Sequence, residues 1–259
     1  MDPIPDDLAP FYAGGYQAIP ATLDELREMA KPQAYRLEPI LKYKTAGKLL
    51  DIGPWIGLFS SNAKDAGFEV TAIEMNADCV AFLNNVVGIG ALQSSDPALT
   101  LGTMHEQFDV ITLWHCLEHL RNPWQVVEQA ARRLVPGGIL LIAIPNIESY
   151  QFGVLKQAWW HLDAPRHLFF YPAKTLENLC YGCGLVSLEI TTGDRLSRTL
   201  SRDAWYVFAR SLVRVRYVRG MLGLMLAWAS SRKEGEPNAG AGLTAIFQRP
   251  FDSDGSKLR

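Results

Sequence analysis

The sequence has little of what marks secreted, membrane-anchored or polyanion-binding proteins. Four scattered cysteines among 259 residues are too few for a disulfide framework, which agrees with a reducing compartment. A net charge of −2 offers no general attraction to nucleic acid. The start, MDPIPDDLAP, lacks the basic and apolar regions of a secretory signal and is too polar for a membrane anchor. We therefore expect a cytoplasmic protein that does not bind nucleic acid.

The cysteines also predict no metal site. Only Cys180 and Cys183 have the two-residue gap of a metal or redox pair. Because no second pair accompanies them, and the glycines around Cys183 indicate the end of a helix, we expect structural thiols.

The chain does contain short apolar runs that alternate with amphipathic stretches. Because 48% of the residues are apolar, one principal core can form. The expected strands are residues 48–52, 69–73, 110–114, 139–144, 185–191 and 243–247, and the expected helices are residues 21–43 with a break at Pro32, 57–65, 77–87, 123–134 and 172–181. Asn122 is the expected cap of the helix that begins at Pro123. This alternation is typical of an α/β fold with a parallel sheet covered on both faces, whose ligands bind beyond the carboxyl ends of the strands.

A glycine turn follows the first of these strands. The chain reads Asp51, Ile52, Gly53, Pro54, Trp55, Ile56, Gly57 and then enters a helix. Glycines let the backbone turn sharply and approach a ligand, and a helix start offers free amides. The second strand ends about twenty residues later in Glu74, where a carboxylate can accept both hydroxyl hydrogens of a ribose. This spacing predicts a site for an adenosine cofactor.

Two kinds of cofactor fit that spacing, a nicotinamide dinucleotide and S-adenosylmethionine. A dinucleotide site uses three glycines, as GxGxxG, to admit a pyrophosphate. Here the bulky Trp55 stands where the second glycine belongs, so a diphosphate fits poorly. A cofactor without phosphate needs no such clearance, and a degenerate site that binds nothing is the remaining alternative.

Five segments, in order, give the chain a family resemblance. They are LLDIGPWIG, AIEMN, FDVITLWHCLEHLRNP, LVPGGILLIAIPN and DAPRHLFFYPAKTLENLCYGCGL. Together they resemble the class I S-adenosylmethionine-dependent methyltransferases, and most closely the group related to the ubiquinone-pathway O-methyltransferases. The resemblance covers about residues 48–181. It implies a Rossmann-like, seven-stranded, mostly parallel sheet with helices on both faces, in which the last strand, residues 243–247, is antiparallel.

The same resemblance implies a set of cofactor contacts, which follow the cofactor from its methionine part to its adenine. Asp51, Gly53 and Gly57 would border the methionine part with Pro54 and Trp55 in the same turn, Glu74 would hold the ribose, Met75 would pack near the adenine, Asp96 would contact the adenine amine, and Trp114 and His115 would line the sulfonium region. The ring of Trp55 either leans away from the cofactor or covers it.

Methyl transfer to a hydroxyl needs alignment and a base that removes a proton. His119 and His167 are the candidate bases, with a purely structural role as the alternative for each. Arg166 is a candidate partner for a carboxylate or phosphate of the acceptor, or else ties its loop to the sheet. His115 and His119, with Glu118 between them, superficially have metal-ligand spacing, but the rest of a zinc-protease motif is absent, so we expect no metal.

A helical insertion is expected before the last strand. It is rich in arginine and leads into the apolar residues 221–229, which are too few to span a bilayer. Three roles fit it: a lid on its own domain, a helix on an anionic membrane surface, or a subunit contact. We divide the chain into an N-terminal lid segment (1–46, with Tyr12 and Tyr16 beside two glycines), a methyltransferase core (47–192), the insertion (193–241), and a last strand with a tail (242–259).

The sequence therefore predicts an S-adenosylmethionine-dependent methyltransferase for a small-molecule acceptor, favouring oxygen over nitrogen or carbon. A lipid-linked acceptor and peripheral membrane contact through residues 195–229 fit a membrane-bound insertion. A nicotinamide-dependent oxidoreductase is the alternative enzyme, disfavoured by Trp55 and by the lack of a recognisable catalytic tyrosine and lysine pair. A non-catalytic cofactor-binding or membrane-docked accessory protein is the third possibility.

Overall fold

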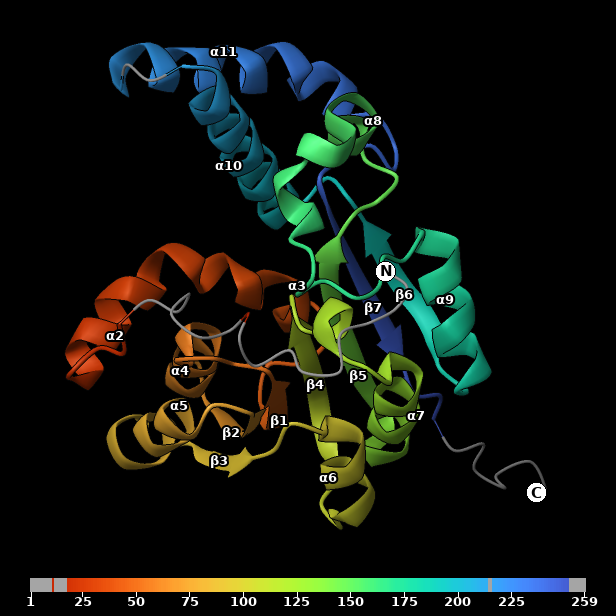
Figure 1. Cartoon of the computed structure of the whole chain (residues 1–259). Coiled ribbons are helices and arrows are strands. Elements are labelled where there is room, and N and C mark those ends of the chain that lie inside the picture. The colour runs from red at the N-terminus through yellow and green to blue at the C-terminus, as the bar shows by residue number, and fades with distance from the viewer. Residues whose placement is uncertain (1–10, 12–17, 214–215, 252–259) are drawn as a thin grey trace.

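One twisted sheet carries the architecture (Figure 1). The computed structural model describes residue 11, residues 18–213 and residues 216–251, and within them seven strands pair in the order β3-β2-β1-β4-β5-β7-β6. The strands are β1 (Gly47–Ile52), β2 (Phe68–Glu74), β3 (Gly90–Gln93), β4 (Phe108–Trp114), β5 (Leu134–Pro145), β6 (Val186–Thr191) and β7 (Gly242–Gln248). β7 runs antiparallel to β5 and β6, while the other neighbours are parallel. The predicted seven-stranded, mostly parallel Rossmann-like sheet is confirmed.

Helices cover both faces of the sheet because successive strand residues point to opposite sides. Leu49 belongs to an apolar cluster with residues of α2 (Leu23–Ala30), α3 (Glu38–Leu41), α4 (Leu58–Asp65) and α5 (Ala77–Phe82). Leu50 belongs to the cluster on the other face, with residues of α6 (Pro97–Thr103), α7 (Pro123–Arg133) and α9 (Ala173–Gly182). The strands buried between these two layers are therefore fixed in register by both clusters.

Shorter helical turns connect these elements. They are η1 (Lys31–Leu37), the π-helical η2 (Leu83–Val87), η3 (Leu117–His119), α8 (Tyr150–Leu155), η4 (Lys156–Ala158) and η5 (Trp160–Leu162). Pro32 lies in η1, which separates α2 from α3, so the predicted break of the leading helical segment is confirmed. The lid residues Tyr12 and Tyr16 lie outside the described residues, as does the tail from residue 252.

Two predictions of local structure need correction. β3 and α6, which are four and seven residues long, were not among the elements expected from the sequence. Elements this short contain too few turns or alternations for a period to be visible. Asn122 does precede α7, but its side chain makes no capping hydrogen bond, so Pro123 and the two arginines of the last turn remain as the helix signals.

The insertion folds as two long helices, α10 (Arg195–Leu212) and α11 (Arg216–Glu234), which pack against each other. We call this pair the hairpin. It projects beyond the end of the sheet where the parallel strands finish (Figure 1). Among the described residues, no helix is both long and apolar enough to cross a membrane.

Candidate functional site

A cavity of about 840 Å³ opens at the carboxyl ends of β1, β2 and β4. This volume lies in the range of small-molecule sites, roughly 300–1,000 Å³. Most of the sequence-predicted site residues line it: Asp51, Gly53, Pro54, Trp55, Glu74, Met75, Asp96, Trp114, His115, His119 and Arg166. Gly57 and His167 are not part of the lining.

The glycine turn after β1 is held tightly against its surroundings. A Cβ on Gly53 would lie 2.6 Å from the Sγ of Cys116, and one on Gly57 would lie 2.5 Å from a methyl of Leu83. Both glycines have positive φ, +74° and +82°. Trp55 is also left-handed, with φ +56°, at a cost of roughly 1–2 kcal/mol for a residue with a Cβ. Such strain is often found at functional sites, and here it accompanies a Trp55 amide that reaches Glu74 in the cavity wall.

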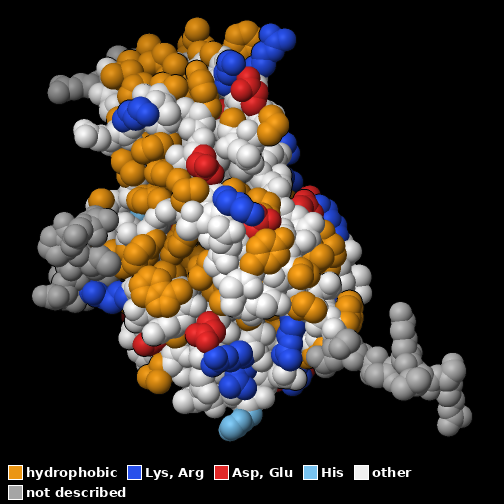
Figure 2. Space-filling model, turned by 90° about the vertical axis from the view of Figure 1, so that its right-hand side faces the viewer, with side chains coloured by type: hydrophobic (Ala, Val, Ile, Leu, Met, Phe, Trp, Pro, Cys, Tyr) orange, Lys and Arg blue, Asp and Glu red, His pale blue; other side chains and the backbone are white. Residues whose placement is uncertain are grey.

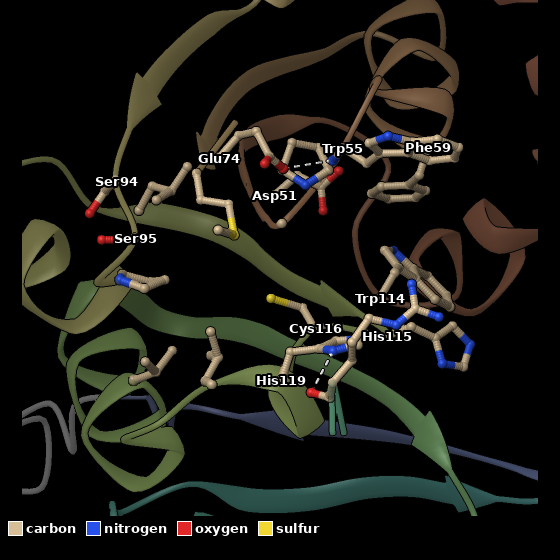
Figure 3. A pocket seen from close by; sticks show the side chains of 18 of the residues that line it. Asp51, Trp55, Phe59, Glu74, Ser94, Ser95, Trp114, His115, Cys116 and His119 are labelled. Atoms are coloured by element: carbon tan, nitrogen blue, oxygen red, sulfur yellow. Dashed lines mark hydrogen bonds between the residues drawn. The ribbon is translucent and has the colours of Figure 1, made fainter. Parts of the chain in front are cut away.

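That amide orients the carboxylate at the end of β2. Glu74 accepts a hydrogen bond at Oε2 from the Trp55 amide (Figure 3) and another at Oε1 from the Asn76 amide, both at 2.9 Å. Each carboxylate oxygen has two acceptor positions, so each keeps one for a ligand. Glu74 is therefore a fixed acceptor of two further hydrogen bonds, which matches the adjacent hydroxyls of a ribose.

Asp51 is the second buried acid of the cavity. Its side chain accepts hydrogen bonds from the hydroxyl of Ser60 at 2.6 Å and from that of Thr112 at 2.9 Å. Burial raises the pKa of Asp51 to about 6, although these hydroxyls and the charge of Arg36 oppose the rise. The carboxylate is thus ready to receive a cationic group, which would restore its ordinary ionisation.

The far end of the cavity holds polar atoms that have no partner among the described residues. They are Nε of Arg36, Oε1 of Gln33, Nε1 of Trp114 and Nε2 of His115. The guanidinium of Arg36 lies 5.3 Å from the ring centroid of Trp114. Burial first, and then the charge of Arg36, lower the pKa of His115 to about 3, so this imidazole is neutral. Arg36 is a cation and Asp51 is an acid that can ionise. Together they suit an amino acid group, such as the methionine part of S-adenosylmethionine.

The opposite end of the cavity is built by the loop between β3 and α6. Ser94 and Ser95 lie there, away from Trp114 and His115 (Figure 3). Asp96 lines the same end, while its Oδ1 caps α6 by accepting from the Leu99 amide at 3.1 Å. Its other carboxylate oxygen matches an adenine amine. The cavity thus offers acceptors for the ribose hydroxyls, the ammonium and the adenine amine, and a cation, Arg36, for the carboxylate, so its residues fit that cofactor.

Sequence reasoning missed Arg36 and Gln33. Both come from η1, where a polar side chain in an amphipathic segment looks like a surface residue. Only the packing of η1 over Trp114 shows that they face a cavity.

The histidine loop, residues 163–171, brings two of the predicted catalytic residues together. The amide of Leu168 donates to the carbonyl oxygen of Glu118 at 2.7 Å and ties this loop to η3. As a result the rings of His119 and His167 lie 4.6 Å apart in an edge-on contact. Nδ1 of His119 lies 3.0 Å from the carbonyl oxygen of Arg166, which requires a proton on that nitrogen.

Burial disfavours the charged form of every member of this cluster. The carboxylate of Glu118 is buried, has no hydrogen bond from the described residues, and has a raised pKa because of burial. Burial lowers the pKa of both His119 and His167, so both rings are neutral at neutral pH. Glu118, His119 and His167 each offer a ligand atom within 4.8 Å of the others, which is also a donor set that a metal ion can use.

Arg166 is engaged within its own loop. Its guanidinium donates to Asp163 at 2.7 Å and 3.2 Å, and both side chains are about one-third exposed. This pair lines the cavity and favours the loop-bracing alternative over acceptor binding for Arg166.

Comparison with known proteins identifies the family. Residues 24–190, more than half of the chain, match the family model described as a methyltransferase domain. The chain belongs to this methyltransferase family. The expectation of a class I S-adenosylmethionine-dependent methyltransferase is confirmed, and the oxidoreductase alternative is wrong.

Individual relatives agree with the family but differ in how much they share. The methyltransferase is 30% identical over 183 residues to a ubiquinone biosynthesis O-methyltransferase of Azoarcus sp., which covers 64% of this chain and 78% of that protein. A Pseudomonas fluorescens protein of the same name is 31% identical over 115 residues, covering 42% of this chain and 49% of its own length. The chain thus spans only about half of several such relatives.

Solved structures support the fold. A S-adenosylmethionine-dependent methyltransferase from Archaeoglobus fulgidus superposes with a TM-score of 0.59 at 16% identity, covering 87% of this chain and 96% of that one. The [4+2]-cyclase SpnF superposes with a TM-score of 0.56 at 18% identity, covering 86% and 83%. Because proteins of such different names share it, this likeness shows the fold alone.

Proposed function

We propose that this methyltransferase moves the methyl group of S-adenosylmethionine to a hydroxyl of a small-molecule acceptor. The observation that carries the proposal is a pair of neutral histidines in edge-on contact, in which the partly buried His119 lines the cofactor cavity and the buried His167 packs against it. Neutral imidazoles are the bases that a hydroxyl acceptor needs. The relatives named as O-methyltransferases of ubiquinone biosynthesis support oxygen as the methylated atom and a lipid-linked acceptor.

Cofactor binding is assigned residue by residue. Glu74 would hold the ribose hydroxyls, Asp51 the ammonium and Arg36 the carboxylate of the methionine part, with Asp96 at the adenine amine. When bound, the cofactor supplies an electrophilic methyl group on its sulfonium. The chain then has to align the acceptor oxygen with that methyl, exclude water and take up one proton.

His119 is proposed as the base that takes this proton. Because its Nδ1 donates to the carbonyl of Arg166, the neutral ring carries its lone pair on Nε2. The nearby carboxyl of Glu118 favours the protonated imidazole and so stabilises the cation that forms. His167, held by the carbonyl oxygen of His161 at 2.7 Å, would position the ring of His119 through their edge-on contact.

Turnover measurements on histidine variants test the assignment. With S-adenosylmethionine and a panel of catechols as probe acceptors, His119→Ala should lose about 100-fold or more in turnover, the usual contribution of a general base. His167→Ala should lose turnover too, while affinity for S-adenosylhomocysteine stays within about threefold in both. His105→Ala is the matched control, because His105 is exposed and lies outside the cavity. Unchanged turnover in both cluster variants would remove them as bases.

The same assay separates catalysis from the non-catalytic alternative. An accessory protein would bind the cofactor yet release no S-adenosylhomocysteine with any acceptor class. Methylated amines in place of methyl ethers would move the proposal from oxygen to nitrogen.

A further inference from the structure

The outer face of α11 exposes a stripe of large apolar side chains. Tyr217, Met221, Leu224, Met225 and Trp228 are 84, 65, 64, 63 and 81% exposed. Their spacing of three and four residues places them on one side of the helix. Apolar side chains gather at this end of the molecule in Figure 2. Contiguous apolar surface of this kind marks an interaction site.

The opposite side of α11 packs against α10, so the stripe is not the side of the helix that forms the core of the hairpin. Leu226 contacts a small buried cluster that includes Trp205 and is joined by Phe208 of α10. A Cβ on Gly223 would lie 3.1 Å from the Cα of Tyr206, which shows how closely the two helices approach. The stripe therefore lies on a helix that close packing against α10 holds in place.

The hairpin is cationic in a chain that is slightly acidic overall. Residues 195–234 contain nine lysines and arginines but two acids, while the whole chain has a net charge of −2. One of those acids, Glu234, points inward and accepts from the indole of Trp205 at 2.7 Å. Arg232 is exposed and follows Trp228 by four residues, so this cation lies on the same side of the helix, at the end of the apolar stripe. Lys233 beside it pairs with Glu236 at 3.0 Å.

We propose that this face of α11 docks onto the surface of an anionic lipid bilayer. An exposed apolar stripe that ends beside the exposed Arg232, on a hairpin rich in arginine, suits a helix lying in the interface, with the apolar side chains in the acyl boundary and the cation at the headgroups. Tyr217 and Trp228, at the two ends of the stripe, have the amphipathic rings that favour this depth. A second copy of the chain fits less well, because two such hairpins would repel each other.

The docked hairpin would lie next to the catalytic loop. Nε2 of His161 lies 3.1 Å from the carbonyl oxygen of Leu200 in α10, and the carbonyl oxygen of the same histidine holds Nδ1 of His167 at 2.7 Å. His161 therefore contacts both the hairpin and one of the two histidines of the cluster, His167. A membrane at α11 would present lipid-dissolved acceptors on the side of the molecule where the cavity wall is formed.

Vesicle sedimentation tests the proposal with the full chain. The protein should pellet with vesicles of phosphatidylcholine and phosphatidylglycerol at low salt, and much less with phosphatidylcholine alone. Arg232→Glu should weaken binding to the anionic vesicles at least about fivefold. The double change Met225→Ser with Trp228→Ser should weaken it at least about tenfold. Leu99→Ser, on α6 and 68% exposed, is the matched control and should bind as the unchanged chain does.

Several results would overturn the proposal. They are no pelleting with the anionic vesicles, equal pelleting with both kinds of vesicle, or binding by the double variant that equals the Leu99→Ser control. Self-association in sedimentation velocity that the double change abolishes, without vesicle binding, would assign the face to a second copy instead. Thermal unfolding of each variant checks that the fold is intact. Because pelleting requires neither cofactor nor acceptor, its failure would leave the proposed methyl transfer untouched.

Discussion

Acidification should weaken cofactor binding about tenfold between about pH 7 and about pH 5, and Asp51 should be the cause. The carboxyl of Asp51 is buried and has a pKa of about 6 in the free protein. We assign it to the ammonium of the methionine part of the cofactor. An adjacent cation favours the ionised carboxylate, so the pKa of Asp51 should fall well below 5 in the complex.

The magnitude follows from the free protein. With a pKa of about 6, Asp51 is about nine-tenths protonated near pH 5 and about one-tenth near pH 7. Protonated protein has to lose that proton before the ion pair forms. The affinity is therefore nearly complete above the pKa and falls as the pH decreases through it, by about tenfold over this range.

Calorimetry with S-adenosylhomocysteine provides the assay, because this product keeps the ammonium and does not react. Titrations in two buffers of different ionisation enthalpy should show release of about 0.9 proton near pH 5 and about 0.1 near pH 7. Asp51→Asn should bind more weakly at neutral pH and lose both the pH dependence and the proton release. A wild-type affinity that is flat from pH 5 to pH 7, or a proton release that survives in the variant, would refute the assignment of Asp51.

Three further predictions follow from the backbone and the histidine cluster. Trp55→Gly should be more stable to urea than Trp55→Ala by about 1 kcal/mol, because glycine accepts a φ of +56° without strain; equal stability would show that the turn is not strained. Gly53→Ala should lose about 1–3 kcal/mol more than Gly67→Ala, because both have positive φ but only the first meets an atom, the sulfur of Cys116, within contact distance. Dialysis against EDTA should leave turnover within about twofold if the cluster works by proton transfer, whereas a loss restored by zinc would identify a metal centre.

The sheet could be predicted where strands are buried on both faces. β4 and the second half of β5 are apolar runs, so their presence and the parallel arrangement followed from the sequence, although β5 begins five residues earlier than expected, at Leu134. β3 is a four-residue edge strand with exposed positions, and within the described part of the chain its one neighbour is β2. Its formation depends on that partner rather than on its own pattern, so the sequence alone did not reveal it.

The candidate site could be predicted where local sequence sets the geometry. Asp51, the glycines and Glu74 stand at strand ends, and strand ends meet at one edge of a parallel sheet. Arg36 could not be found this way, because its role depends on how η1 packs over β4. The contact of His119 with His167 likewise needs a hydrogen bond between segments about fifty residues apart, from Leu168 to the carbonyl of η3.

The central claim is that the cavity at the ends of β1, β2 and β4 holds S-adenosylmethionine. Equilibrium dialysis of the full chain against methyl-labelled S-adenosylmethionine tests it most directly. We predict one retained equivalent, displaced by excess S-adenosylhomocysteine but not by NAD, and a strong loss of retention in Glu74→Ala. Absence of retained label in the unchanged chain, or displacement by NAD as effective as by S-adenosylhomocysteine, would contradict the account.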